Sequence, residues 1–342
     1  MPAGPDPRAR LLPAVFLTAV SAEKKRRSPW RWILAAVLAA VLLYFSLRGV
    51  DWRRVWQAIV EAQWRYLAIG AGFSVGTFFL RSLRWRVLLN AEAHFTVPTV
   101  FWATMAGYLG NNFLPARAGE LVRSLLISGR SSLSKAYVLT TALTERLMDA
   151  IALVLCGSVV LLQVNPKPKW MDEVSHVTAT IAAIGAIAVF VLPHAEGLVK
   201  HLLRRMPLPS AIRDRLLGFA EQVLLGLRVF HHTGRLTTFT LLTVLIWTLD
   251  ASSVMIGSRG FGFQISFPVA LLLLTGMGLG SALPSTPGYV GIYQFVAVTV
   301  LTPFGIDRNA ALAYIIVAQA LGYLIVLCLG LAGLNKFRAE NQ

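Results

Sequence analysis

The chain of 342 residues is 56% hydrophobic and only 14% charged, and its mean hydropathy is +0.63. Soluble domains carry about 25% charged residues, so this composition excludes a soluble globular protein and indicates an integral membrane protein. The formal net charge of +16 does not predict nucleic-acid binding, because the basic residues lie in short segments between apolar runs, as the positive-inside rule distributes them. No group of residues has metal-ligand spacing, so we expect neither a metal nor another cofactor.

The N-terminal residues 1–29 contain a run of four basic residues, Lys24 to Arg27. A cleaved signal peptide would export this run against the positive-inside rule, so we expect a disordered basic cytoplasmic tail instead. The remainder, residues 30–338, is expected to form a single all-α polytopic membrane domain. Its predicted full spans are residues 31–47, 66–80, 137–162, 176–192, 236–257 and 309–334.

Three polar stretches connect or flank these spans. Residues 48–65 are amphipathic and rich in tryptophan, which predicts an interfacial helix on the outer surface. Arg81, Arg84 and Arg86 follow the second span and are interpreted as its cytoplasmic flank. Residues 196–235 combine seven basic residues with apolar residues at helical spacing, which predicts a basic amphipathic helix on the cytoplasmic leaflet.

Two further apolar segments, residues 97–128 and 267–302, are each interrupted by a Leu-Pro break. The pattern Leu-Pro-x-x-x-Gly occurs at residues 114–119 in the first segment and at residues 283–288 in the second. Each arm has only about 12 to 17 residues, whereas a transmembrane helix needs roughly 20. Irregular backbone at membrane depth is tolerated only in a protein interior or beside water, so we predict two re-entrant helical hairpins.

The distribution of basic residues orients these elements. Six full spans and two hairpins leave both termini on the cytoplasmic side, where Lys and Arg concentrate. In this topology residues 66–162 form a span, a hairpin and a span that begin on the outer side. Residues 236–334 repeat the order from the inner side, and the segment 196–235 joins the two halves. The fold is therefore predicted to be an inverted repeat, an arrangement typical of alternating-access transporters.

Charged residues at membrane depth define the candidate site, because such charges usually face a protein interior or an aqueous cavity. Arg117 and Arg123 follow the first Leu-Pro break on a half-helix whose positive N-terminal end would stabilise an anion. Arginine binds phosphate in bidentate fashion, so both residues are candidates for contact with a lipid headgroup. The alternative is a buried structural network in which arginines pair with carboxylates. The candidate substrate-binding residues are Asn112, Arg117, Glu120, Arg123, Glu145, Arg146, Asp149, Asp250, Ser285, Thr286 and Tyr293.

Three motifs in order carry a family resemblance. They run from Asn112 to Arg123, from Glu145 to Asp149 and from Leu283 to Gln294, and read Asn-x-Leu-Pro-x-Arg-x-Gly-Glu-x-x-Arg, Glu-Arg-x-x-Asp and Leu-Pro-Ser-x-Pro-Gly-x-x-Gly-x-Tyr-Gln. Over about residues 30–338 the chain resembles the lysylphosphatidylglycerol synthase transmembrane-region family, which includes the flippase half of the bacterial multiple peptide resistance factor. The resemblance implies a multi-pass protein of the bacterial inner membrane that moves lipids between leaflets. Because the sequence ends at Gln342 without a soluble domain, we expect no aminoacyl-transferase activity.

The favoured function is therefore a lipid flippase-like transporter for a polar-headgroup or phosphate-bearing lipid. The expected partners are membrane lipids, a further copy of the chain or a separate lipid-synthesising protein, and no nucleic acid. No nucleotide-binding loop is visible, so transport would run downhill or be coupled to a gradient. One alternative is a membrane enzyme acting on a lipid headgroup, with Glu120 or Asp149 as general base. Another is a scaffold without transport activity.

Overall fold

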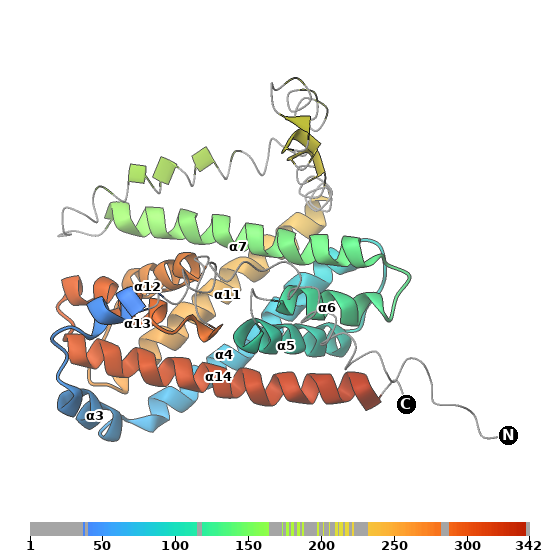
Figure 1. Cartoon of the computed structure of the whole chain (residues 1–342). Helices are drawn as coiled ribbons and strands as arrows, with labels where there is room; N and C mark the ends of the chain where they lie inside the picture. The colour runs from blue at the N-terminus through green and yellow to red at the C-terminus, as the bar shows by residue number, and fades with distance from the viewer. Residues whose placement is uncertain are drawn as a thin grey trace.

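A computed structural model describes the chain continuously over four stretches, residues 40–114, 118–163, 232–281 and 287–339, with Val37 and isolated positions between 173 and 221. Helices and turns make up these described stretches, and no β-strand occurs in them, which confirms the all-α class (Figure 1). The helices are α3 Trp52–Val60, α4 Trp64–Leu89, α5 Val97–Phe113, α6 Gly119–Ser128, α7 Lys135–Gln163, α11 Thr233–Arg259, α12 Phe267–Gly280, η3 Pro287–Tyr289, α13 Ile292–Leu301, η4 Thr302–Phe304 and α14 Arg308–Ala339.

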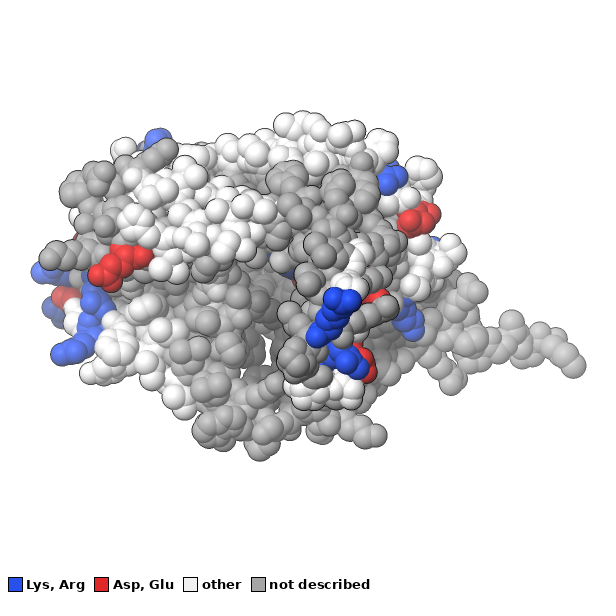
Figure 2. Space-filling view, turned by 90° about the horizontal axis from the view of Figure 1, so that it is seen from above, with Lys and Arg blue, Asp and Glu red and all other residues white. Residues whose placement is uncertain are grey.

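Three of the described helices, α4, α11 and α14, are long and apolar enough to cross a membrane. Figure 2 shows one face of the molecule, on which Lys, Arg, Asp and Glu form several separate groups among described residues that are otherwise uncharged. Helix α7 has 29 residues and, apart from Lys135 at its start, carries its charged residues Glu145, Arg146 and Asp149 in its interior. The predicted tail at residues 1–29 lies outside the described chain, as do most of the span at 176–192 and of the segment at 196–235.

Helix α4 corrects the predicted end of the second span. The span was expected to end at Leu80, but α4 continues to Leu89 and buries Arg84 completely. Arg81 also lies within the helix, with a side chain that is only 12% exposed. The prediction fails because carboxylates on neighbouring helices neutralise both arginines, so the helix continues through them into the protein interior.

The central helix pair is α4 with α11, which run antiparallel. At one end the Ser253 hydroxyl donates a hydrogen bond to the Gly70 carbonyl at 2.8 Å. Further along α4, and correspondingly earlier on α11, Arg84 Nη1 donates to Thr243 Oγ1 at 3.1 Å. In Figure 1 both helices run diagonally between α7 and α14, which lie on opposite sides of the pair.

Two shorter helix pairs pack toward the two ends of this central pair: the first pair, α5 and α6, and the second pair, α12 and α13 (Figure 1). Both begin in the same way, because Pro98 in α5 and Pro268 in α12 occupy the first helical turn, where a missing N–H is tolerated. Helix α5 packs on α14, and α12 packs on α7. The breaks that the Leu-Pro pattern predicted therefore separate packed helices in both halves. The two halves therefore share the same pattern of helix packing. That the two pairs enter a membrane from opposite sides, and that they turn back inside it, stay predictions.

Helix α3 is a short amphipathic helix that packs on α14. Asp51 caps its start by accepting hydrogen bonds from the backbone N–H groups of Arg53 and Arg54. Val55 is buried in the core, whereas Trp52 and Trp56 are exposed. This arrangement suits an interfacial helix, in which aromatic side chains occupy the headgroup region.

Candidate functional site

Four arginines and four carboxylates form one ion-pair network near the middle of α7. Four helices contribute to it, and the formal charges of its members sum to zero. The members are Arg81 and Arg84 on α4, Glu120 and Arg123 on α6, Glu145, Arg146 and Asp149 on α7, and Asp250 on α11. The structure thus brings together six of the sequence-predicted residues and adds Arg81 and Arg84.

Arg84 lies at the centre of the network and is fully buried. Its guanidinium binds Asp149 in bidentate fashion, with Nη1–Oδ1 at 2.7 Å and Nη2–Oδ2 at 2.8 Å. Nη2 also donates to Glu145 Oε1 at 3.1 Å, and the guanidinium carbon lies 5.0 Å from the centre of the Phe239 ring. A planar guanidinium can serve two carboxylates and a ring face at once, which a lysine ammonium cannot do. Arg84 therefore ties α4 to α7 and α11.

Arg123 joins α6 to α7 and is 2% exposed. Nη1 lies 2.8 Å from Glu145 Oε2, and Nε donates to Glu120 Oε2 on its own helix. The guanidinium carbon lies 4.3 Å from the centre of the Trp85 ring. Of the two interpretations that the sequence left open for Arg123, this burial and pairing favour the structural one.

Arg81 and Asp250 form the edge of the network that faces α11. Arg81 Nη2 lies 2.8 Å from Asp250 Oδ2, and Nη1 lies 3.4 Å from Asp149 Oδ2. The Arg81 guanidinium also lies over the ring of Trp247, 5.2 Å from its centre. Asp250, an isolated acid in the sequence of α11, therefore has a buried counter-charge from α4.

Arg146 is the most exposed member of the network, with 35% of its side chain accessible. Its Nε lies 2.8 Å from Glu120 Oε1, and its Nη1 lies 3.9 Å from Asp149 Oδ2. On the same helix Leu143 and Leu147 are exposed apolar residues. The network is thus most accessible at the half-buried Arg146 side chain, which has exposed apolar residues one turn before it and directly after it.

Asn111 positions the start of α6. Its Oδ1 accepts from the Gly119 backbone N–H at 3.0 Å, and its Nδ2 donates to Glu120 Oε1 at 3.2 Å. A Cβ at Gly119 would lie 1.9 Å from the Gly107 carbonyl oxygen, so only glycine allows α6 to approach α5 this closely. Asn112, the residue predicted from the motif, is half-buried one position further along α5.

The second pair carries a neutral hydrogen-bond chain in place of ion pairs. Gln294 accepts from the Gly291 N–H at 2.8 Å and donates to Gln319 Oε1 at 2.7 Å. Gln319 in turn donates to the Gly288 carbonyl at 2.6 Å and to the Tyr323 hydroxyl at 2.7 Å. This chain fastens the turn before α13 to α14.

The predicted residues near the two breaks have different outcomes. Tyr293 lies on α13 and stacks on Tyr289, with ring centres 5.1 Å apart. Arg117, Ser285 and Thr286 lie outside the described residues.

Sequence reasoning missed Arg81 and Arg84, although a signal was present. They lie three positions apart, hence on one side of a helix, and Val87, Leu88 and Leu89 continue the apolar character beyond them. Gln319 and Tyr323 were missed because an isolated polar residue in an apolar helix does not reveal its partner.

Interrupted helix pairs around a charge-balanced network buried among long apolar helices define this chain as an all-α membrane protein. Residues 32–330 match the family described as the lysylphosphatidylglycerol synthase TM region. Since this match covers most of the sequence, the chain belongs to that family.

Curated relatives agree with this assignment. Two proteins of Methanothermobacter thermautotrophicus called UPF0104 membrane proteins are 23% and 22% identical to the chain, over 81% and 87% of it and 85% and 91% of their own lengths. The glycosyltransferase AglD of Haloferax volcanii is 24% identical over 86% of the chain, but the match covers only 51% of that relative.

Proposed function

We propose that the protein is a lipid flippase-like transporter that moves a polar-headgroup or phosphate-bearing lipid between leaflets. The observation that carries this proposal is the partly accessible side chain of Arg146, which joins a neutral, largely buried ion network to exposed apolar residues. Membership of the lysylphosphatidylglycerol synthase transmembrane-region family supports a membrane role. The proposed location is the bacterial inner membrane, with both termini cytoplasmic.

The pairing around Glu120 explains why Arg146 is suited to meet a headgroup. Glu120 is held not only by Arg146 but also by Arg123 and Asn111. If Arg146 exchanges Glu120 for a phosphate, the carboxylate therefore keeps two donors and is not left uncompensated. This matters because an unpaired charged side chain at the bilayer centre costs about 2.5–3.5 kcal/mol. A guanidinium accepts phosphate and carboxylate in similar bidentate geometry, so the exchange conserves hydrogen bonds.

The surroundings of Arg146 supply a path for the acyl chains. Phe113 and Leu121, at the facing ends of α5 and α6, are exposed apolar residues, as is Leu147 on α7. Acyl chains could stay against such a surface while the headgroup contacts the network. Arg117, in the segment between α5 and α6, is proposed to add a second guanidinium. Ser285 and Thr286 are proposed to contact the headgroup from the second pair.

The network argues against the enzymatic alternative. Glu120 and Asp149, the candidate general bases, each accept hydrogen bonds or ion pairs from at least two arginines. Their oxygens already accept from arginines, which leaves them poorly placed to take a proton from a substrate. The activity in the name of the glycosyltransferase AglD belongs to a relative about twice as long as the matched region.

Reconstitution tests the proposal directly. Purified protein in liposomes that contain fluorescent phosphatidylglycerol is treated with dithionite, which bleaches only outer-leaflet lipid. We expect protein-dependent exposure of inner-leaflet lipid, at least tenfold slower in Arg146→Ala and partly restored in Arg146→Lys. Arg54→Ala, at an exposed arginine of α3, is the matched control and should transport normally.

Two outcomes would contradict the proposal. The first is that wild-type protein moves phosphatidylglycerol no faster than protein-free liposomes do. If phosphatidylethanolamine and polyprenyl-phosphate probes also fail to move, transport of polar-headgroup and phosphate-bearing lipids is rejected. Chromatography of the recovered lipids provides the second outcome, because a chemically altered lipid would indicate an enzyme instead.

A further inference from the structure

Each of the four arginines in the ion network faces an aromatic ring, at 4.3 to 5.4 Å between the guanidinium carbon and the ring centre. Three of these arginines have side chains no more than 12% exposed, whereas that of Arg146 is 35% exposed. The ring that faces Arg146 belongs to Tyr108 on α5. Tyr108 is therefore the aromatic partner of the most accessible arginine in the network.

Tyr108 is half-buried, and neighbouring helices support its ring. The ring centre lies 5.4 Å from that of Phe78 on α4. The side chain also packs against an apolar cluster that contains Met105 on α5 and Val326 on α14. A tyrosine side chain is rigid, with two rotatable bonds, so it loses little conformational freedom when such contacts hold it. Tyr108 thus presents a fixed surface to Arg146.

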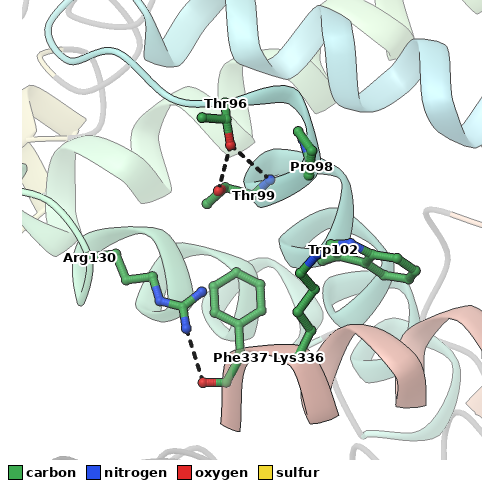
Figure 3. Close-up of a pocket in the computed structure, with 7 residues that line it drawn as sticks. All are labelled: Thr96, Pro98, Thr99, Trp102, Arg130, Lys336 and Phe337. Atoms are coloured by element: carbon green, nitrogen blue, oxygen red, sulfur yellow. Dashed lines mark hydrogen bonds between the residues drawn. The ribbon is translucent and has the colours of Figure 1, made fainter. Parts of the chain in front are cut away.

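An aromatic contact and hydrogen bonds use different parts of a guanidinium. The N–H groups donate in the plane of the group, whereas the ring lies over its face. Figure 3 shows both contacts on another arginine, in a pocket of about 240 Å³ between α5 and α14. There Arg130 Nη2 donates to the Phe337 carbonyl at 3.0 Å, while the guanidinium carbon lies 3.9 Å from the centre of the Phe337 ring. The contact between Arg146 and Tyr108 can therefore persist while the N–H groups of Arg146 change partner.

Helix α5 contacts both members of the ion pair between Arg146 and Glu120. Tyr108 contacts the arginine, and Asn111, one turn later, donates from Nδ2 to Glu120 Oε1 at 3.2 Å. Arg146 Nε lies 2.8 Å from the same oxygen. If this pair opens, Asn111 still holds Glu120 and Tyr108 still holds Arg146. Without the ring, the long arginine side chain would regain rotamer freedom on leaving Glu120, and binding a ligand would then cost that entropy.

We propose that Tyr108 is a positioning residue, which holds the Arg146 guanidinium in place while a headgroup phosphate replaces Glu120 as its partner. This inference rests on the proposed function, because it assigns a role within the same headgroup site. The ring of Tyr108 carries the role, and its hydroxyl is not required. A variant that keeps the ring and a variant that removes it should therefore differ.

The test compares Tyr108→Leu with Tyr108→Phe in the dithionite assay. We expect Tyr108→Leu to slow lipid movement about three- to tenfold and Tyr108→Phe to stay within about twofold of wild type. In an Arg146→Ala background Tyr108→Leu should cause no further slowing, because the ring acts through that arginine. The matched control is Tyr66→Leu, which removes another arginine–tyrosine contact, that of Arg65 with Tyr66 at 4.8 Å, from the start of α4.

A binding measurement separates this inference from the proposed function. Short-chain phosphatidylglycerol is titrated onto the full-length protein in detergent, and binding is followed by microscale thermophoresis. We expect Tyr108→Leu to weaken binding about three- to tenfold and Tyr108→Phe to bind as wild type. If these differences appear but wild-type protein moves no lipid, the proposed transport fails and the positioning role stands. If wild-type protein moves lipid and Tyr108→Leu matches it in both measurements, transport stands and the positioning role is rejected.

The remaining outcomes also decide the question. Tyr108→Phe as slow as Tyr108→Leu would assign the role to the hydroxyl and overturn the proposal. Further slowing by Tyr108→Leu in the Arg146→Ala background would overturn it too, since Tyr108 would then act independently of that arginine. Wild-type protein that neither binds nor moves phosphatidylglycerol would reject the phosphate contact that Tyr108 is proposed to support.

A second variant covers the case in which Tyr108→Leu does not fold. Phe78→Leu removes the support of the ring while Tyr108 stays in place. We expect it to slow lipid movement by a smaller factor than Tyr108→Leu would, again without further slowing in the Arg146→Ala background. Wild-type transport in Phe78→Leu would then overturn the proposal.

Discussion

The two helix pairs share a motif and a packing position but differ in chemistry. The first pair, α5 and α6, leads into a network of eight charged residues. The second pair, α12 and α13, leads into a chain of neutral amide and hydroxyl hydrogen bonds through Gln294 and Gln319. The packing geometry of a half therefore does not determine its chemistry. We infer that, in the proposed transporter, the charged residues of the first half would contact the lipid headgroup. The second half would contribute a hydrogen-bonded, uncharged surface.

The glycines at the end of the shared motif sharpen this comparison. A Cβ at Gly119 would meet backbone atoms of α5, including the Gly107 carbonyl oxygen at 1.9 Å and the Asn111 nitrogen at 2.6 Å. A Cβ at Gly288 would meet a side-chain atom, the Tyr323 hydroxyl oxygen, at 2.4 Å, and Gly288 also has a positive φ of 77°. The same motif position thus serves helix–helix contact in one half and turn geometry in the other.

The largest expected effect comes from breaking the charged half at its centre. Arg84→Ala removes the fully buried arginine that Glu145 and Asp149 share, leaving Glu145 with Arg123 and Asp149 with Arg81 and Arg146. Removal of one member of a buried ion pair typically costs about 3–5 kcal/mol. We expect a correspondingly large fall in the Tm of the purified protein, measured by tryptophan fluorescence. Arg54→Ala, whose side chain is 71% exposed, should leave the Tm unchanged. A small shift for Arg84→Ala would indicate that water enters and compensates the carboxylates.

A smaller effect is expected at the close approach of α5 and α6. Gly119→Ala must push the backbones apart, and overpacking of this kind costs roughly 1–3 kcal/mol or more. Because α6 carries Glu120 and Arg123, we also expect slower lipid transport in the dithionite assay. Gly72→Ala on α4 meets nothing within 4 Å and is the matched control for both measurements. Wild-type stability in Gly119→Ala would show that the two helices are more loosely packed than described.

The sequence predicted much of this architecture because breaks leave local signals. Both Leu-Pro interruptions and the Trp-rich amphipathic helix α3 follow from residue type and period, and the structure contains a packed helix on each side of both breaks. The predicted carboxylates Glu120, Glu145, Asp149 and Asp250 also lie together in one network. Charge at membrane depth is costly, so these residues had to find partners within the fold.

The partners themselves could not be predicted with the same success. Arg81 and Arg84 at the end of an apolar run have the pattern of a positive-inside flank, and only the carboxylates of other helices show that they are buried. Asn111 rather than Asn112 contacts Glu120 because one residue along a helix rotates the side chain by about 100°. Selecting the correct asparagine requires knowing which face of α5 meets α6, and that is a tertiary property.

The smallest expected effect lies in the neutral half and completes the comparison. Gly288→Ala has two costs, a strained positive φ of about 1–2 kcal/mol and a collision with the Tyr323 hydroxyl. Tyr323→Phe removes that hydroxyl together with its hydrogen bond from Gln319, for about 1 kcal/mol. We therefore expect the double variant to be more stable than the sum of the single losses predicts, since the closest collision is removed and only a 2.9 Å approach to the ring carbon Cζ remains. The Tm values of the four proteins in this cycle measure the coupling, and strict additivity would show that Tyr323 does not constrain this turn. Gly119→Ala has no such rescue, because two of the atoms it meets, the Gly107 carbonyl oxygen and the Asn111 nitrogen, belong to the backbone of α5.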